Sequence, residues 1–264
     1  ISIHITSMND YMVKNYNCIA GQTLSADTET NSDDSIFDIL NKLNLKQEDW
    51  LTFDKKLRKK NIDLLVMAND FPSFEFSKKL SVSAYVLSPA SFQEYQLIRE
   101  ITYTKKPIYL RTGGATLNEV QEVVAEIRKH ASTVQVILLG GIQLYPTPIQ
   151  DLRLKSLSTL RNKFKDAHLE FGLADHIDGE NPFAKFLPAL ALCFGATVLE
   201  KHITTNREEK LEDYEAALGI KQFKEFVDFI RVAELGIGSP DLEYMDNITG
   251  AYKQYREVSR KKIV

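Results

Sequence analysis

The sequence predicts an α/β protein, a (β/α)8 TIM barrel. Eight short apolar runs occur along the 264 residues, and amphipathic helical patterns lie between most of them. The runs are mostly continuous rather than alternating, which is typical of strands buried on both faces of a parallel sheet. A barrel of this class takes roughly 250 residues, so the length also fits. A doubly wound open sheet of similar size is the alternative.

The predicted strands are short, and the first two lie unusually close together in the chain. The strands are Ile1–Thr6, Met12–Tyr16, Asp63–Met67, Ala84–Leu87, Ile108–Arg111, Val134–Leu139, His168–Phe171 and Thr197–Lys201. Only residues 7–11 separate the first two, whereas a parallel crossover needs about a dozen residues or more. Either Ile1–Thr6 is not a barrel strand, or the first crossover is incomplete in this sequence. The first residue is Ile1 rather than Met, which fits an absent segment.

The helical patterns are clearest over Thr116–His130. Thr116 and Glu119 fit a capping box, and apolar residues then recur every three or four positions. A last helix runs through Phe223 and Ile230 and is expected to end near Gly236. Two earlier helices are predicted from the spacing of Ile36, Leu40 and Leu43 and of Trp50, Phe53 and Leu57.

Composition argues against several classes of partner. The 33 basic and 36 acidic residues give a net charge of −3, so a general attraction to nucleic acid is not expected. The longest apolar run, Phe186–Leu199, is interrupted by Pro188 and falls short of the ~20 residues that a membrane span needs. Two cysteines are too few for a disulfide framework, which favours a reducing compartment. We therefore expect a cytoplasmic protein without membrane or nucleic-acid partners.

Polar residues at the ends of the predicted strands are the candidate site residues, because barrels carry their active sites at the C-terminal ends of the strands. They are Lys14, Asn69, Ser88, Arg111, Thr112, Gln143, Tyr145, Asp175, His176, Glu200, Lys201 and His202.

Two of these candidates, His176 and His202, belong to neighbouring predicted strands and should lie side by side. Two imidazoles can bind a divalent metal, with water or substrate in the other positions. Two ordinary hydrogen-bonded histidines would fit the same spacing. Asp175 and Glu200 could orient an imidazole or pair with Lys201. Lys201 could instead form a Schiff base, as in barrel aldolases, or be an ordinary surface lysine.

Four segments resemble motifs of the sialic acid synthase family, which includes N-acetylneuraminate, legionaminic acid and pseudaminic acid synthases. They are Gly141–Thr147 (G-I-Q-L-Y-P-T), Gly172–Gly179 (with A-D-H), Gly195–Thr204 (with E-K-H) and Leu211–Leu218 (with L-E-D-Y). The resemblance runs from about Val13 to the C-terminus. The chain is identified as a member, in the variant subgroup that carries Y-P-T and A-D-H.

The resemblance implies a condensation of phosphoenolpyruvate with an N-acetylated amino sugar, which releases phosphate and yields a nine-carbon 2-keto acid. It also implies a divalent metal, manganese or magnesium, on His176 and His202. The acidic residues near the sugar would be Glu200 and Asp213. The residues that bind phosphoenolpyruvate would be Lys14, Gln143 and Tyr145. Asn69, Arg111, Thr112 and Asp175 are further expected substrate contacts, and Lys201 of E-K-H an expected catalytic residue.

Several positions depart from the family pattern. Val86 stands where the fourth strand usually ends in a lysine that binds phosphoenolpyruvate. Arg111 replaces the serine of S-T-G and could supply the missing positive charge. The glutamate of the first strand is absent, and His4 takes its position if Ile1–Thr6 is that strand. These departures leave open a barrel that binds a sugar acid or an anion without catalysing the reaction.

The expected domain organisation is a catalytic barrel over residues 1–255 followed by a linker that starts at residues 256–264. The last residues resemble the segment before a small antifreeze-like domain in full-length members. In the family, that domain reaches across a dimer to the partner's site, so the resemblance implies a homodimer.

Overall fold

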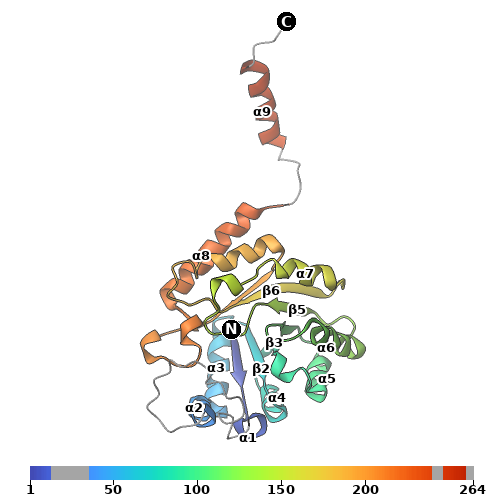
Figure 1. Cartoon of the computed structure of the whole chain (residues 1–264), viewed down its shortest axis with the longest axis vertical. Coiled ribbons are helices and arrows are strands. Elements are labelled where there is room, and N and C mark those ends of the chain that lie inside the picture. Colours follow the sequence, from blue (N-terminus) through green and yellow to red (C-terminus); the bar gives the residue numbers. More distant parts are fainter. Residues whose placement is uncertain (13–35, 240–245, 260–264) are drawn as a thin grey trace.

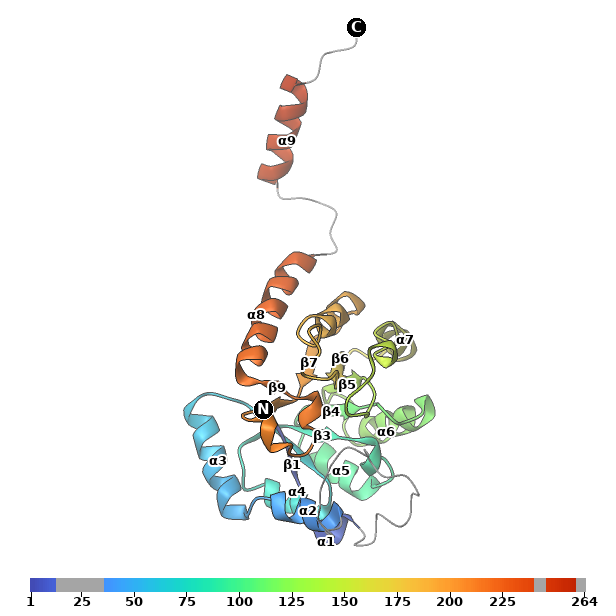
Figure 2. The ribbon, with the colours of Figure 1, turned by 60° about the vertical axis from the view of Figure 1, so that its left-hand side comes forward.

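Seven parallel strands form a single curved sheet in this protein, and their order in the sheet follows the chain. The computed structural model describes residues 1–12, 36–239 and 246–259. Helices surround the strands on the outside (Figures 1 and 2). The predicted barrel class is therefore confirmed, with a main sheet of seven strands in the described residues. These are β1 (Ser2–Ile5), β2 (Leu64–Ala68), β3 (Val82–Leu87), β4 (Ile108–Arg111), β5 (Val136–Gly140), β6 (Leu169–Asp175) and β7 (Val198–Lys201).

The helices occupy the connections between the strands and the C-terminal segment. They are α1 (Met8–Tyr11), α2 (Ile36–Leu43), α3 (Gln47–Lys59), α4 (Phe71–Ser77), α5 (Tyr95–Tyr103), α6 (Leu117–His130), α7 (Ser156–Lys163), α8 (Ile220–Ile237) and α9 (Asp246–Ser259). A 3-10 helix, η4 (Leu187–Phe194), takes the helical position between β6 and β7. None of the helices in the described ranges has the length and apolar character that a membrane crossing requires.

The first strand corrects one part of the sequence-based topology. Strand β1 pairs directly with β2, with Ser2 opposite Leu65 and Ile5 opposite Ala68. The prediction that another strand intervenes between these two is therefore wrong, although Ile1–Thr6 does contain a barrel strand. The connection from β1 to β2 includes α1, α2 and α3, so an incomplete first crossover is not needed to explain the sheet. The predicted strand Met12–Tyr16 lies outside the described residues from residue 13 onward.

The predicted helices agree closely with the structure. Helix α6 begins after Thr116, whose hydroxyl accepts from the Glu119 N–H, while the Glu119 carboxylate accepts from the Thr116 N–H. This reciprocal capping satisfies amide groups that the first helical turn leaves unpaired. The helices predicted around Ile36, Trp50 and Phe223 correspond to α2, α3 and α8.

The two faces of the sheet pack against different surroundings. One face and the helices outside it form the main core, which contains Val66, Leu110 and Val136. The alternate residues of the same strands point into the barrel, where Leu139 and Ala174 form a small separate cluster. This alternation follows from the period of two in a β-strand. It means that every second residue near a strand end faces the barrel interior.

Strand β6 is longer than the sequence pattern predicts. The prediction stops at Phe171, whereas β6 continues through Gly172 to Asp175 and pairs with β7 over these residues. A Cβ on Gly172 would lie 2.6 Å from the Val198 carbonyl oxygen, so the missing side chain lets the two strands approach. The glycine therefore continues the strand rather than ending it.

The chain beyond the barrel includes α8 and α9. Helix α8 contacts η4 beside the barrel, and α9 extends away from the strands in both views (Figures 1 and 2). The predicted boundary after residue 255 falls inside α9. The predicted linker at residues 256–264 stays a prediction, and residues 260–264 lie outside the described part.

We predict that Gly141→Ala lowers the free energy of unfolding by more than about 2 kcal/mol, because of backbone strain and a steric clash. Gly141 has φ +125°, and an added Cβ would lie 2.1 Å from the Ala174 carbonyl oxygen. Gly236→Ala in α8 is the matched control, because nothing lies within 4 Å of its added Cβ. In a helix, this change should be neutral or stabilise by up to about 1 kcal/mol. Urea denaturation measures the free energy of unfolding of both variants and of the wild type. Equal stability of the two variants would contradict the prediction.

Candidate functional site

Two histidines and a tyrosine form an aromatic cluster where β5, β6 and β7 end. His176 directly follows β6 and His202 directly follows β7. Their ring centroids lie 5.2 Å apart, and the Tyr145 ring lies 4.4 Å from His176 and 5.6 Å from His202. The prediction that the two histidines are neighbours is confirmed. The Tyr145 hydroxyl donates to Gln143 Oε1 at 3.0 Å, so the predicted Gln143 joins the same cluster.

His176 presents one nitrogen that has no protein partner. Its Nδ1 lies 2.8 Å from the Ile142 carbonyl oxygen, which can only accept, so Nδ1 carries the proton. Its Nε2 therefore carries a lone pair, and this atom is buried without a hydrogen-bond partner. Burial lowers the pKa of His176 to about 4, so the ring is neutral near pH 7. A buried, neutral, unpartnered imidazole nitrogen has the chemistry of a metal ligand.

His202 is also neutral and has an acidic neighbour. Burial, followed by the nearby His176, lowers the pKa of His202 to about 3. Its Nδ1 lies 3.8 Å from Asp213 Oδ2. Burial, with the neighbouring Glu212 and Glu215 carboxylates, raises the pKa of Asp213 to about 7. The predicted acid of the L-E-D-Y segment thus lies beside the predicted metal histidine.

The histidine pair fits a divalent cation held by two protein nitrogens. In the described residues, no group of three or more histidine, cysteine, aspartate or glutamate side chains gathers in a way that could hold a metal ion. The two imidazoles would therefore leave the other coordination positions to water or substrate oxygen. The unpartnered Nε2 of His176 is the observation that supports this fit.

A second cluster crosses the barrel interior and centres on Arg111. Its Nη2 lies 2.9 Å from Glu200 Oε1, and both side chains are largely buried. Its Nη1 lies 3.5 Å from His4 Nε2. Since β1, β4 and β7 are not neighbours in the sheet, these three residues meet across the barrel. The Arg111 Nε is buried without a partner, so the guanidinium retains a free donor.

The contacts of Arg111 with His4 and Glu200 were not predicted from the sequence. Burial, and then the charge of Arg111, lowers the pKa of His4 to about 4, so Arg111 carries the positive charge. Val86, at the position expected to carry a lysine, is fully buried on β3. Sequence spacing gives no signal for contacts between strands that are not neighbours, and these contacts follow only from the curvature of the whole sheet around its interior.

Lys201 and Asp175 form a buried ion pair on the other side of the sheet. The Lys201 Nζ donates to Asp175 Oδ2 at 2.7 Å and to the Ile177 carbonyl at 2.7 Å, and neither side chain is exposed. They are register partners between β6 and β7. Because adjacent residues alternate in direction, both point away from the interior that Glu200 faces. This placement favours a structural role over the predicted catalytic and substrate-binding roles, and it gives no support to a Schiff base on Lys201.

Two further predicted residues, Asn69 and Thr112, hydrogen-bond to neighbouring strands, and a third, Lys14, lies outside the described part. Asn69 Nδ2 donates to Thr6 Oγ1 at 2.8 Å, which joins the ends of β1 and β2. The Thr112 hydroxyl donates to the Leu139 carbonyl at 3.0 Å, which joins β4 to β5. Lys14 lies outside the described residues. The structure thus gathers Gln143, Tyr145, His176, His202 and Asp213 into one group and His4, Arg111 and Glu200 into another.

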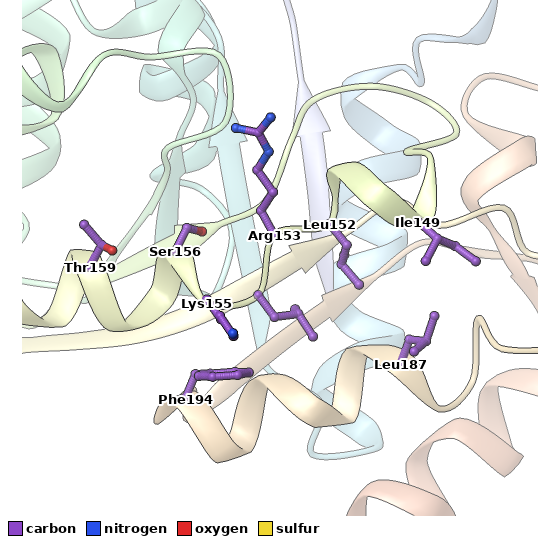
Figure 3. Close-up of a pocket in the computed structure, with 9 residues that line it drawn as sticks. Ile149, Leu152, Arg153, Lys155, Ser156, Thr159, Leu187 and Phe194 are labelled. Atoms are coloured by element: carbon purple, nitrogen blue, oxygen red, sulfur yellow. The ribbon is translucent and has the colours of Figure 1, made fainter.

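A pocket of about 630 Å³ lies apart from both groups, between η3 (Ile149–Asp151), α7 and η4. Its apolar walls include Leu152, Leu187 and Phe194, and Arg153 and Lys155 lie at its border (Figure 3). It contains none of the candidate site residues, so we assign the candidate site to the strand ends.

The chain matches one protein family over most of its length. The model of the NeuB family matches residues 10–241. A pseudaminic acid synthase of Campylobacter jejuni is 33% identical over 169 residues, which are 64% of this chain and 47% of the relative. An N,N'-diacetyllegionaminic acid synthase of Legionella pneumophila is 26% identical over 80% of this chain and 58% of the relative. The chain spans about half the length of the curated relatives it matches.

The comparison with solved structures supports the barrel fold. An N-acetylneuraminic acid synthetase from Leptospira borgpetersenii, solved with citrate, has a TM-score of 0.74 at 22% identity and covers 85% of this chain and 75% of its own. A putative spore coat polysaccharide biosynthesis protein E from Chromobacterium violaceum has a TM-score of 0.75 at 17% identity and covers 96% of this chain and 69% of its own. At these identities, the likeness is one of fold.

We predict that Asp175→Asn lowers the free energy of unfolding by about 3 kcal/mol, because it leaves the Lys201 charge buried and unpaired. The double variant Asp175→Asn/Lys201→Met should recover much of this loss, since it removes both charges. The control is Asp228→Asn, which breaks an exposed pair with Lys224 and should cost less than about 1 kcal/mol. Chemical denaturation measures all three, and an Asp175→Asn protein as stable as the control would show that the pair does not hold these strand ends.

Proposed function

Because the chain belongs to the NeuB family, we propose that it condenses phosphoenolpyruvate with an N-acetylated amino sugar, with consumption of one water and release of phosphate. The product would be a nine-carbon 2-keto sugar acid of the sialic acid type. The observation that carries this proposal is the pair of neutral histidines at the strand ends, with one buried nitrogen free. The four sequence motifs and the similarity to pseudaminic and legionaminic acid synthases support it.

His176 and His202 would hold a divalent metal, manganese or magnesium. When bound, such an ion polarises a carbonyl oxygen, here that of the sugar aldehyde. Asp213, beside His202, would form hydrogen bonds with the sugar hydroxyls, accepting them as a carboxylate or donating one when protonated. The Tyr145 ring lies against both histidines and would exclude water from one side of the pair. These residues would orient the aldehyde toward the carbon of phosphoenolpyruvate that forms the new bond. Such orientation accounts for much of the rate enhancement in reactions that join two bound substrates.

Arg111 would bind the phosphate or the carboxylate of phosphoenolpyruvate. Its guanidinium is buried, always charged and holds one unpaired N–H inside the barrel. Charge-assisted hydrogen bonds from arginine to phosphate or carboxylate are strong in such a site. Glu200 balances the charge of Arg111 in the absence of the anion. Once phosphoenolpyruvate is bound, Glu200 would face the sugar. Arg111 would in this way replace the lysine that the family carries at the position of Val86.

The assay that tests the proposed function measures phosphate release with phosphoenolpyruvate, Mn²⁺ and a panel of amino sugars that includes N-acetylmannosamine. We expect release with at least one sugar, and a loss on the order of 100-fold or more in His176→Asn and His202→Asn. His130→Asn is the control, because His130 lies on the outer helix α6 and contacts Glu126. Metal binding without phosphate release for any sugar would contradict the proposal and favour a barrel that only binds a sugar acid or an anion.

A pair of variants tests the role of Arg111. Replacing Arg111 alone leaves Glu200 buried and unpaired, so we compare Glu200→Gln with Arg111→Met/Glu200→Gln. The double variant should bind phosphoenolpyruvate at least about 10-fold more weakly than Glu200→Gln, because it lacks the charged donor. Isothermal titration with phosphoenolpyruvate measures this difference without turnover. Equal affinities in the two variants would show that Arg111 does not bind the anion.

A further inference from the structure

Arg207 closes the loop that carries Asp213. This loop leaves a short strand, β8 (Ile203–Thr204), and returns through a parallel partner, β9 (Leu218–Gly219). The Arg207 Nη1 donates to the carbonyl oxygens of Tyr214 at 2.6 Å and Glu215 at 3.3 Å, and also to that of Ala217. One guanidinium nitrogen thus contacts three main-chain carbonyl oxygens in the segment just before β9. We call this arrangement the Arg207 clasp.

The clasp also touches the loop that follows His176. Asp178 Oδ1 and Glu180 Oε1 each lie 3.6 Å from Arg207 nitrogens. Between them, the Gly179 N–H donates to the Glu215 carbonyl at 2.7 Å. A Cβ on Gly179 would lie 2.0 Å from the Ala217 carbonyl oxygen, so only glycine permits this approach. The clasp therefore joins the loop after β6 to the loop after β7.

The backbone at Asp213 requires outside support. Asp213 has φ +58°, a left-handed conformation that costs a residue with a side chain roughly 1 kcal/mol or more. The carboxyl it carries is half-buried and lies 3.8 Å from His202 Nδ1. On the returning side, the Leu218 N–H donates to the His202 carbonyl at 2.9 Å. The clasp lies between this anchor and Asp213, where it can hold the turn in place.

We propose that Arg207 is a positioning residue that holds the Asp213 carboxyl beside His202 and thereby sets the affinity for the acceptor sugar. The part that concerns the sugar rests on the proposed function, in which Asp213 orients its hydroxyls. Arg207 faces main-chain carbonyls and not the barrel interior, so it acts through the loop. A guanidinium suits this place because Nη1 donates to the carbonyls while Nη2 and Nε lie 3.6 Å from Asp178 and Glu180. The single nitrogen of a lysine ammonium does not reproduce this spread.

The test uses Arg207→Lys and Arg207→Gln in the full chain, with Arg231→Gln as control. Arg231 lies on α8, is exposed and pairs with the nearby Glu234. Amide hydrogen exchange of residues 211–217 should quicken at least about 10-fold in both Arg207 variants and stay unchanged in the control. This measurement needs no turnover. Unchanged exchange in both Arg207 variants would overturn the clasp.

The kinetic readout separates a positioning role from a general structural one. Both Arg207 variants should raise KM for the amino sugar about 10-fold or more, while KM for phosphoenolpyruvate changes less than about twofold. An equal rise of both KM values would overturn the link between the clasp and the sugar. A wild-type protein that releases no phosphate would contradict the proposed function, and hydrogen exchange would then still decide whether Arg207 orders the Asp213 loop. If Arg207→Gln does not fold, Arg207→Lys provides the same comparison.

Discussion

The register between β6 and β7 determines which residues can reach the interior of this barrel. Gly172 lies opposite Val198, and Asp175 lies opposite Lys201. Because side chains alternate along each strand, a shift of one residue would turn Glu200 outward and Lys201 inward. The histidines that follow the two strands would change sides as well. Gly172 lets the strands approach in this register, and the orientation of the site residues depends on that register.

Much of the fold was predictable because its signals are local. The capping box before α6, the apolar strands and the placement of the two histidines on adjacent strand ends all follow from short segments of sequence. The order of β1 and β2 was not predictable from the spacing of apolar runs, because pairing depends on what lies across the sheet and not on what comes next in the chain. The meeting of Arg111 with Glu200, and of Arg207 with three carbonyls, has the same long-range origin.

Two ion pairs lie on opposite faces of β7, and their surroundings give them different properties. Lys201 and Asp175 are enclosed by the sheet and the outer layer, and the lysine also donates to a carbonyl. That pair has little capacity to accept another partner. Arg111 and Glu200 face the interior, where the arginine keeps a donor without a partner. Glu200 thus belongs to a pair that can take a further partner, whereas the next residue, Lys201, belongs to a pair that cannot.

The hydrogen bond between Gly179 and Glu215 has a consequence for the two loops that it joins. It joins the segments after β6 and β7 through main-chain atoms. No side chain introduced elsewhere would supply an equivalent link. A main-chain link of this kind couples the local opening of one segment to that of the other. A displacement of the segment after His176 therefore also acts on the segment that carries Asp213.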